Sequence, residues 1–253
     1  MENSLACRSD SYGRFQSIAY EHLAELGVRY VEIALPPPDR ISDTLAELER
    51  YGLSASSIHA GLALKNPGIG SEYVRVARAA RELGAQNIFV SATMGELGPA
   101  TAYGRLREVG DACAEEDVTL VLETHPDLVT NGDTARRTME NVGHPNVRVN
   151  WDTANVHYYN EGIDEISELT TVLEYVGGVH LKDTNGGYHT HHFPPIGQGV
   201  VDYPAVFRVL NESGFYGPFT IELEGIEGVV LDEDGTKAMF AESVAYLRGI
   251  GVV

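Results

Sequence analysis

Cysteine and long apolar runs are scarce among the 253 residues of this sequence. Two cysteines, Cys7 and Cys113, are too few for a disulfide framework, so we expect a protein of the reducing cytoplasm. No stretch reaches the ~18 uninterrupted apolar residues of a membrane span. The first ten residues lack the basic and apolar segments of a secretory signal. We therefore expect no membrane partner and no export.

Positive charge is also in short supply. The chain has 18 Lys and Arg against 37 Asp and Glu, which gives a formal net charge of −19. Binding to a polyanion needs clustered Lys and Arg, and the sequence contains no basic run, which argues against a nucleic-acid partner. Only three of the basic residues are lysines, namely Lys65, Lys182 and Lys237. A lysine among candidate site residues is therefore unusual in this chain.

A unit that does recur is a short β-branched run, a turn and an amphipathic helical stretch. Strands are predicted at residues 4–7, 30–35, 54–61, 87–93, 119–125, 148–155, 178–183 and 219–224. Helices are predicted at residues 15–26, 42–51, 71–83, 102–116, 134–141, 165–175, 204–212 and 236–248. Strict alternation predicts a parallel sheet, and eight pairs in about 250 residues favour a closed barrel. The predicted fold class is α/β, a single (β/α)₈ TIM barrel that forms one domain over residues 1–253.

The last four predicted strands each divide into an apolar and an ionisable set, because side chains alternate along a strand. In strand 119–125, Leu120 and Leu122 lie on one side and Glu123 on the other. The apolar set suits the helix layer, so we expect the ionisable set to point into the barrel. Its members near the carboxyl ends of these strands are Glu123, Asp152, His180 and Glu222. Glu224 is the alternative to Glu222 in the last strand.

So many ionisable side chains inside a barrel need a compensating charge. Burying a lone carboxylate is costly, whereas three carboxylates and an imidazole form an oxygen-rich ligand set for a cation. Barrel active sites lie at the carboxyl ends of the strands. We therefore expect one divalent metal ion, Mn²⁺ in the first place, with Mg²⁺, Co²⁺ or Zn²⁺ as alternatives.

At these four segments the sequence resembles the xylose-isomerase-like sugar-phosphate isomerase/epimerase family. The matching stretches are "VLETH" around Glu123, "NWDTANV" around Asp152, "VHLKD" around His180 and "FTIELE" around Glu222. "PIGQGVVDY" at 195–203 is similar to the glycine-rich segment before the seventh helix of these proteins. The resemblance covers nearly the whole chain. It implies that all four residues bind the metal and that Glu123 and Glu222 also act as a paired acid and base.

The activity that this resemblance implies is that of an isomerase or epimerase. The substrate would be a small carbohydrate or polyol: a sugar, a sugar phosphate or a keto-polyol. The metal polarises a ketone and its neighbouring hydroxyl, which acidifies the adjacent C–H. One glutamate removes the proton and the other returns it from the opposite face of the substrate.

Two positions depart from the D-tagatose-3-epimerase-like branch of the family. Asn155 stands where those enzymes carry a histidine, and Gly186 stands where they carry an arginine. We therefore expect the substrate to be held differently from a free ketohexose. The endonuclease IV branch needs further metal histidines, of which His59 can match one. Ser91 and Asn155 stand where others would be, and the net charge opposes DNA.

The stretch "HLKD" also occurs in the inosose-dehydratase-like branch, which eliminates water from a keto-inositol. Lys182 lies two residues after His180, on the same side of the predicted strand. We therefore predict that it acts as a catalytic proton donor or carrier at a substrate oxygen. Its structural alternative is an ion pair with Asp152 or Glu224. A metal-dependent dehydratase or lyase that acts on a keto-inositol or a 3-keto-sugar is therefore the alternative function. A further alternative is a sugar-binding barrel without catalysis.

Other polar residues are expected to line the substrate pocket. These are His59, Glu32, His125 and Asn155, together with Lys182. The long loop 184–201 carries three histidines, His189, His191 and His192. We expect this loop to be mobile and to close over the pocket rather than to hold a second metal. Whether the chain forms a homo-oligomer stays open.

Overall fold

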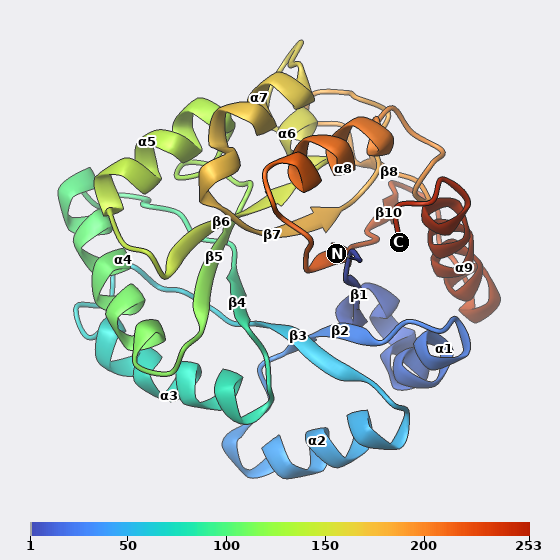
Figure 1. Cartoon of the computed structure of the whole chain (residues 1–253), viewed down its shortest axis with the longest axis horizontal. Helices are drawn as coiled ribbons and strands as arrows, with labels where there is room; N and C mark the ends of the chain where they lie inside the picture. The colour runs from blue at the N-terminus through green and yellow to red at the C-terminus, as the bar shows by residue number, and fades with distance from the viewer. Residues whose placement is uncertain (1) are drawn as a thin grey trace.

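The computed structural model describes residues 2–253 and has a closed barrel of parallel strands at its centre (Figure 1). The barrel strands are, in order, β1 Leu5–Arg8, β2 Tyr30–Ala34, β3 Ser54–His59, β4 Asn87–Val90, β5 Thr119–Glu123, β6 Val147–Asp152, β7 Val176–Leu181 and β9 Phe219–Ile221. Pairing of β9 with β1 closes the ring. The predicted TIM barrel is confirmed, although every strand except β1 ends earlier than the sequence predicted.

Helices surround this barrel and connect its strands (Figure 1). The α-helices are α1 Ala19–Glu25, α2 Ile41–Arg50, α3 Ile69–Glu82, α4 Pro99–Ala114, α5 Gly132–Val142, α6 Asn155–Tyr158, α7 Glu165–Val172, α8 Tyr203–Glu212 and α9 Glu233–Gly249. Short 3₁₀ segments are η1 Ser9–Ile18, η2 Pro38–Arg40 and η3 Leu173–Tyr175. All eight predicted helices are present, and the first of them, predicted at 15–26, begins within η1. The earlier part of η1, η2 and α6 were not predicted. Within residues 2–253, no helix is long and apolar enough to cross a membrane.

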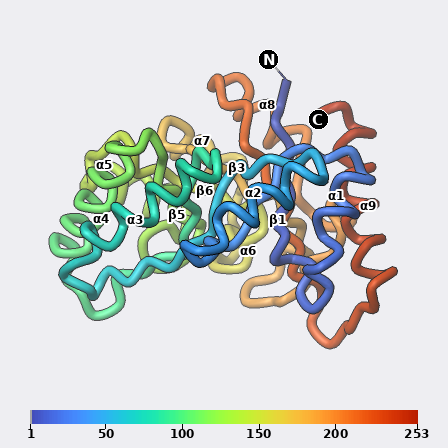
Figure 2. Tube along the Cα trace, turned by 90° about the horizontal axis from the view of Figure 1, so that it is seen from below, coloured from blue at the N-terminus to red at the C-terminus, as the bar shows by residue number. Residues whose placement is uncertain are grey.

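The first and last helices meet on one side of the molecule. Both views place α1 and α9 beside each other, away from α3, α4 and α5 (Figure 2). Tyr12 of η1 stacks on Phe240 of α9, with ring centroids 4.1 Å apart. This contact supports the β1–β9 seam, where the barrel closes between segments that are far apart in the sequence.

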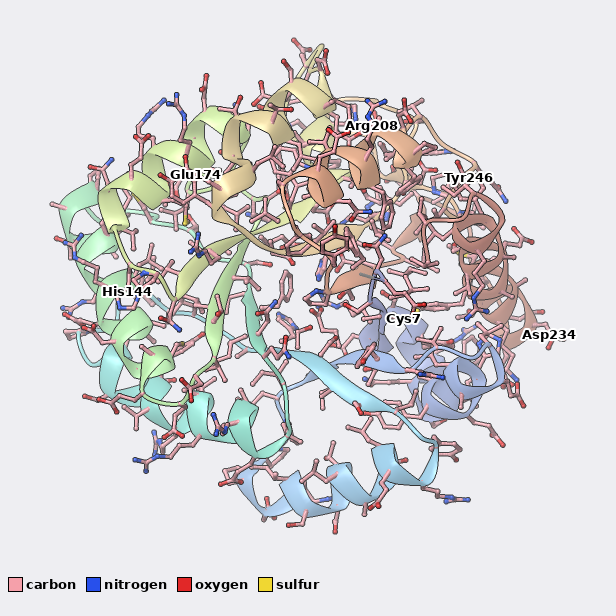
Figure 3. The ribbon with its side chains drawn as sticks, in the orientation of Figure 1. Cys7, His144, Glu174, Arg208, Asp234 and Tyr246 are labelled. Carbon is pink, nitrogen blue, oxygen red and sulfur yellow. The ribbon has the colours of Figure 1, made fainter. Side chains whose placement is uncertain are left out.

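The hydrophobic core lies between the strands and the helices. Trp151 of β6, Leu181 of β7 and Ile221 of β9 are all fully buried in it. Cys7 of β1 lies in the same layer, whereas Asp234 points outward from α9 (Figure 3). Because apolar side chains of these strands face the helices, the alternating positions face the inside of the barrel. The division that the sequence predicted therefore holds.

The loop between β7 and α8 has a scaffold of its own, which the sequence did not predict. Its strand β8 His192–Phe193 pairs in antiparallel fashion with β10 Gly225–Ile226, outside the barrel. The backbone N–H of His189 donates to the carbonyl of Tyr158 at 2.9 Å. The loop predicted to be mobile is thus attached to two neighbouring segments on the way to α8.

Asp183, directly after β7, attaches the same loop to the barrel. Its carboxylate is fully buried and accepts four backbone N–H groups. The donors are Gly197 at 2.8 Å, Gly199 at 2.9 Å, Thr184 at 2.9 Å and Val201 at 3.3 Å. A Cβ atom at Gly199 would lie 2.1 Å from Asp183 Oδ1, so only glycine allows the loop backbone to come this close to the carboxylate.

Asp183→Asn is expected to destabilise the protein by about 2–4 kcal/mol. An amide offers one acceptor oxygen where two are used, so buried N–H groups lose their partner, at about 1–3 kcal/mol each. Urea denaturation measures the loss. The matched control is Asp202→Asn at the N-terminus of α8, where Asp202 accepts the N–H of Ala205 and asparagine caps equally well. Equal stability of the two variants would contradict this role of Asp183.

Candidate metal centre and active site

Four ionisable side chains meet inside the barrel at the carboxyl ends of its later strands. Glu123 ends β5, Asp152 ends β6, and His180 lies near the end of β7, while Glu222 follows β9 directly. One ligand atom from each of them lies within 4.8 Å of those of the other three. All four side chains are buried. The structure thus brings together the residues that strand parity singled out.

In both His180 and Asp152, one polar atom of the side chain contacts the protein, while the other faces the space between the four ionisable side chains. His180 Nε2 lies 3.3 Å from Glu32 Oε2, which leaves Nδ1 facing Glu222 Oε2 at 3.4 Å. Asp152 Oδ1 accepts the backbone N–H groups of Ala154 and Asn155, both at 2.8 Å. Asp152 Oδ2 and His180 Nδ1 are buried and make no hydrogen bond in the described part of the chain, although Oδ2 lies 3.1 Å from the ammonium of Lys182. These two atoms and two glutamates are a donor set that fits a divalent cation.

Glu32 lies beneath the pocket, not in its wall as the sequence predicted. Its side chain is buried, accepts the Ser57 hydroxyl at 2.6 Å and faces His180. The reason is its height in the barrel: Glu32 is the third of the five residues of β2, whereas His59 is the last residue of β3. A carboxylate in this position fixes the orientation of a ligand imidazole.

Glu32→Gln is expected to weaken the binding of Mn²⁺ by about 10- to 100-fold, because the imidazole loses its charged partner. Competition with a chromogenic chelator measures the dissociation constant. Glu47→Gln, which changes an exposed glutamate of α2, is the matched control and should leave it unchanged. An unchanged constant in Glu32→Gln would show that Glu32 does not position His180.

Lys182 lies in the same cluster and is almost fully buried. Its Nζ lies 2.9 Å from Glu222 Oε2, 2.9 Å from Glu224 Oε2 and 3.1 Å from Asp152 Oδ2. The structural alternative considered for this lysine, a pair with Asp152 or Glu224, is therefore present. Although burial opposes its charge, these carboxylates hold the pKa of Lys182 well above its usual value. Lys182 also lines the pocket, so its ammonium can reach a ligand.

Arg8 is a site residue that the sequence did not reveal. It ends β1, and its Nη1 donates to Glu222 Oε1 at 2.8 Å, while its Nη2 contacts His59 Nδ1 at 3.1 Å. The same guanidinium lies 3.5 Å from Glu32 Oε1 and over the ring of Phe89. The sequence offered one indication of this role. Side chains alternate along a strand, so Arg8 lies on the same, barrel-facing side of the first strand as Ala6.

The two glutamates of the cluster have different surroundings. Burial, followed by the charge of Glu222, raises the pKa of Glu123 to about 8, and Glu123 accepts the Ser91 hydroxyl. Burial also acts on Glu222, but Lys182 and His180 outweigh it and hold its pKa well below the usual value. The pair therefore has one carboxyl that takes up a proton readily and one that stays ionised.

A pocket of about 300 Å³ opens above this cluster. Of the predicted substrate residues, His59, His125, Asn155 and Lys182 line it, as do Glu123 and Glu222. The rest of the wall consists of residues that the sequence analysis did not predict to bind substrate. These are Arg8, Ser91, Tyr158, Tyr159, His191, Phe193 and Glu224. Tyr158 and Tyr159 come from the short helix α6 and its end, whose existence the strand pattern did not predict.

The family of the chain follows from its sequence as well as its fold. Residues 20–250 match the model of the xylose isomerase-like TIM barrel family, and the chain belongs to this family. The polar cluster lies at the barrel face where the fold places active sites.

Curated relatives include sugar epimerases and a dehydratase. An L-ribulose 3-epimerase of Methylomonas sp. (strain DH-1) is 26% identical over 229 residues, which are 79% of this chain and 75% of that protein. A 3-dehydroshikimate dehydratase of Bacillus anthracis is 23% identical over 130 residues, 44% of this chain and 45% of that protein. The L-ribulose-5-phosphate 3-epimerase UlaE of Salmonella paratyphi C is 29% identical over 120 residues, 47% and 40%. The chain thus matches less than half the length of the last two.

Solved structures show the same fold. An L-ribulose 3-epimerase superposes with a TM-score of 0.78 at 17% identity, over 100% of this chain and 95% of that one. The IOLI protein with a bound zinc atom gives a TM-score of 0.76 at 19% identity, over 96% and 97%. At such identities the likeness concerns the fold alone.

Proposed function

We propose that the protein is a metal-dependent isomerase or epimerase of a sugar, a sugar phosphate or a keto-polyol. The observation that carries this proposal is the convergence of Glu123 and Glu222 beside Asp152 and His180 at the floor of a pocket. Two carboxyl groups that face one pocket suit a reaction that removes a proton and returns one. The sugar epimerases among the relatives support the same reading.

Glu123, Asp152, His180 and Glu222 would hold the metal ion. Mn²⁺ is our first choice because three of these ligands are carboxylates, and Mg²⁺, Co²⁺ and Zn²⁺ are the alternatives. When bound, the ion would polarise a substrate carbonyl and acidify the neighbouring C–H.

The chain's own residues would carry the proton. One of the two glutamates takes it from the carbon next to the carbonyl, and the electron pair of that C–H bond moves into an enediolate. The other glutamate donates a proton to the opposite face of the carbon, which completes an epimerisation. Arg8 and Lys182 hold Glu222 in place from two sides, and Ser91 holds Glu123. Tyr158 and Phe193 supply aromatic walls of the pocket against which a substrate can pack.

A dehydratase or lyase is the second candidate, favoured by Lys182. Elimination needs an acid that protonates a departing hydroxyl, and the Lys182 ammonium lines the pocket on the side of β7. The substrate would then be a keto-inositol or a 3-keto-sugar. A barrel that binds a sugar without catalysis is the remaining alternative. We disfavour it because each of the four metal-ligand positions carries a side chain that can bind a metal ion.

Solvent exchange tests the proposed reaction. The Mn²⁺-loaded protein is incubated in D₂O with ketoses, ketose phosphates, keto-inositols and 3-keto-glycosides, and loss of the C–H signal is followed by NMR. We expect exchange next to the carbonyl, whether epimerisation or elimination follows. Turnover that leaves every carbon-bound hydrogen in place would contradict the proposal.

We also propose that residues 1–253 form one domain and that the protein works in a reducing cytoplasm. Cys7 and Cys113 are both buried and free, which supports the second of these proposals.

A further inference from the structure

Both fixed positive charges of the pocket are already taken up by carboxylates. Lys182 has three ammonium protons and three carboxylate neighbours within 3.1 Å, from Asp152, Glu222 and Glu224. Arg8 has Glu222 at 2.8 Å and Glu32 at 3.5 Å. Among the described residues that line the pocket, these two are the only Lys or Arg side chains. An anionic substrate group would have to displace a carboxylate from one of them.

The charge around the pocket stays negative even with a dication in place. Six carboxylates lie on or directly behind its walls: Asp10, Glu32, Glu123, Asp152, Glu222 and Glu224. Arg8, Lys182 and a divalent ion together supply four positive charges. Six carboxylates exceed this number when Glu123 is ionised, and the other five still exceed it when Glu123 is protonated. The whole chain, at −19, adds to the negative potential that an approaching anion meets.

The small volume keeps every part of a bound sugar near this charge. About 300 Å³ is at the lower end of the range for ligand pockets. A phosphate on a five- or six-carbon chain would therefore lie within about 8 Å, one screening length, of several carboxylates. The remaining wall combines polar side chains, those of His59, Ser91, His125, Asn155 and His191, with the aromatic rings of Tyr158, Tyr159 and Phe193. The polar groups suit the hydroxyls of a neutral sugar, and the rings suit its C–H face.

We propose that the pocket selects an uncharged ketose or keto-polyol and rejects substrates that carry a phosphate or a carboxylate. This inference rests on the proposed function and narrows its substrate class. It separates the chain from relatives whose names specify L-ribulose 5-phosphate or 3-dehydroshikimate, although the fold is shared.

Matched pairs of substrates test the selection. Neutral ketoses and keto-inositols are compared with their monophosphates on the Mn²⁺-loaded protein, and kcat/KM for solvent exchange is measured by NMR. L-ribulose with L-ribulose 5-phosphate is one pair. We expect the neutral member of any pair that reacts to be favoured by about 100-fold or more, as for two unit charges of repulsion at a screened site. A phosphate favoured over its parent would overturn the inference and leave the proposed function intact. Absence of exchange with every compound, neutral or charged, would overturn the proposed function itself, and the inference with it.

Glu224→Gln tests whether the excess of carboxylates causes the selection. Glu224 is half exposed and lies 2.9 Å from Lys182, so the substitution removes one negative charge and frees one ammonium proton. The preference for the neutral substrate is expected to fall by about tenfold. Glu47→Gln, on the exposed face of α2, is the control with the same change of net charge and should leave the preference unaltered. An equal preference in wild type and Glu224→Gln would show that carboxylates of the wall do not discriminate.

Discussion

Glu123→Gln and Glu222→Gln are each expected to slow solvent exchange at the substrate C–H by about 10²- to 10⁴-fold. An amide cannot accept the proton, and general acid–base catalysis contributes a factor of this size. Both side chains also belong to the metal cluster, so part of the loss would come from weaker binding of the ion. The rate is measured by NMR in D₂O at saturating Mn²⁺, which separates the two causes.

The double variant should be little slower than either single variant, because residues that act as one unit are not additive. Glu47→Gln is again the matched control, since it removes the same charge from the exposed face of α2. If either single variant kept more than about a tenth of the wild-type rate at saturating metal, the paired-glutamate reaction would be wrong.

Lys182→Met is the second change with a large expected effect, and it separates the two candidate reactions. In a lyase, the variant should form no product while exchange at the C–H persists, because only protonation of the leaving hydroxyl is lost. In an epimerase, the same change should slow exchange and product formation together. We expect the second result, and NMR follows both processes in one sample.

Loss of the Lys182 ammonium has a cost for the fold as well. Its removal leaves three carboxylates without their shared counterion, and breaking a buried ion pair costs about 3–5 kcal/mol. Urea denaturation of the metal-free protein should show this loss, and Mn²⁺ should restore part of it. Lys237→Met is the control, because this partly exposed lysine at the surface of α9 pairs with Glu233 of its own helix and lies outside the site. Unchanged kinetics in Lys182→Met together with a loss of stability would assign the lysine a purely structural role.

Much of the fold could be predicted from the sequence because the barrel repeats one simple pattern. Eight alternations of strand and helix and the parity of the last four strands were sufficient to place Glu123, Asp152, His180 and Glu222 at one face. Parity is a local property, so a single sequence reveals it. The strand ends were less accurate, because side chains such as Asp152 turn the chain out of the sheet by accepting N–H groups just beyond it.

Residues that depend on distant partners could not be predicted in the same way. Arg8 is one of fifteen arginines, and its bond to Glu222 spans 214 positions of the chain. Glu32 has the predicted parity but lies one level too deep to touch a ligand in the pocket, a height that only the assembled barrel determines. The histidine loop was predicted to be free, because its anchor Asp183 uses backbone N–H groups that no sequence pattern marks.

Metal content is the most direct test of the central claim, that the barrel holds one divalent ion between Glu123, Asp152, His180 and Glu222. Wild type, Asp152→Asn and His180→Ala are loaded with Mn²⁺, dialysed together and analysed for metal and protein by elemental analysis. We expect about one ion per chain in the wild type and less than about a tenth of that in both variants, since each removes a ligand from a buried site. Full occupancy in both variants, or none in the wild type, would contradict the claim.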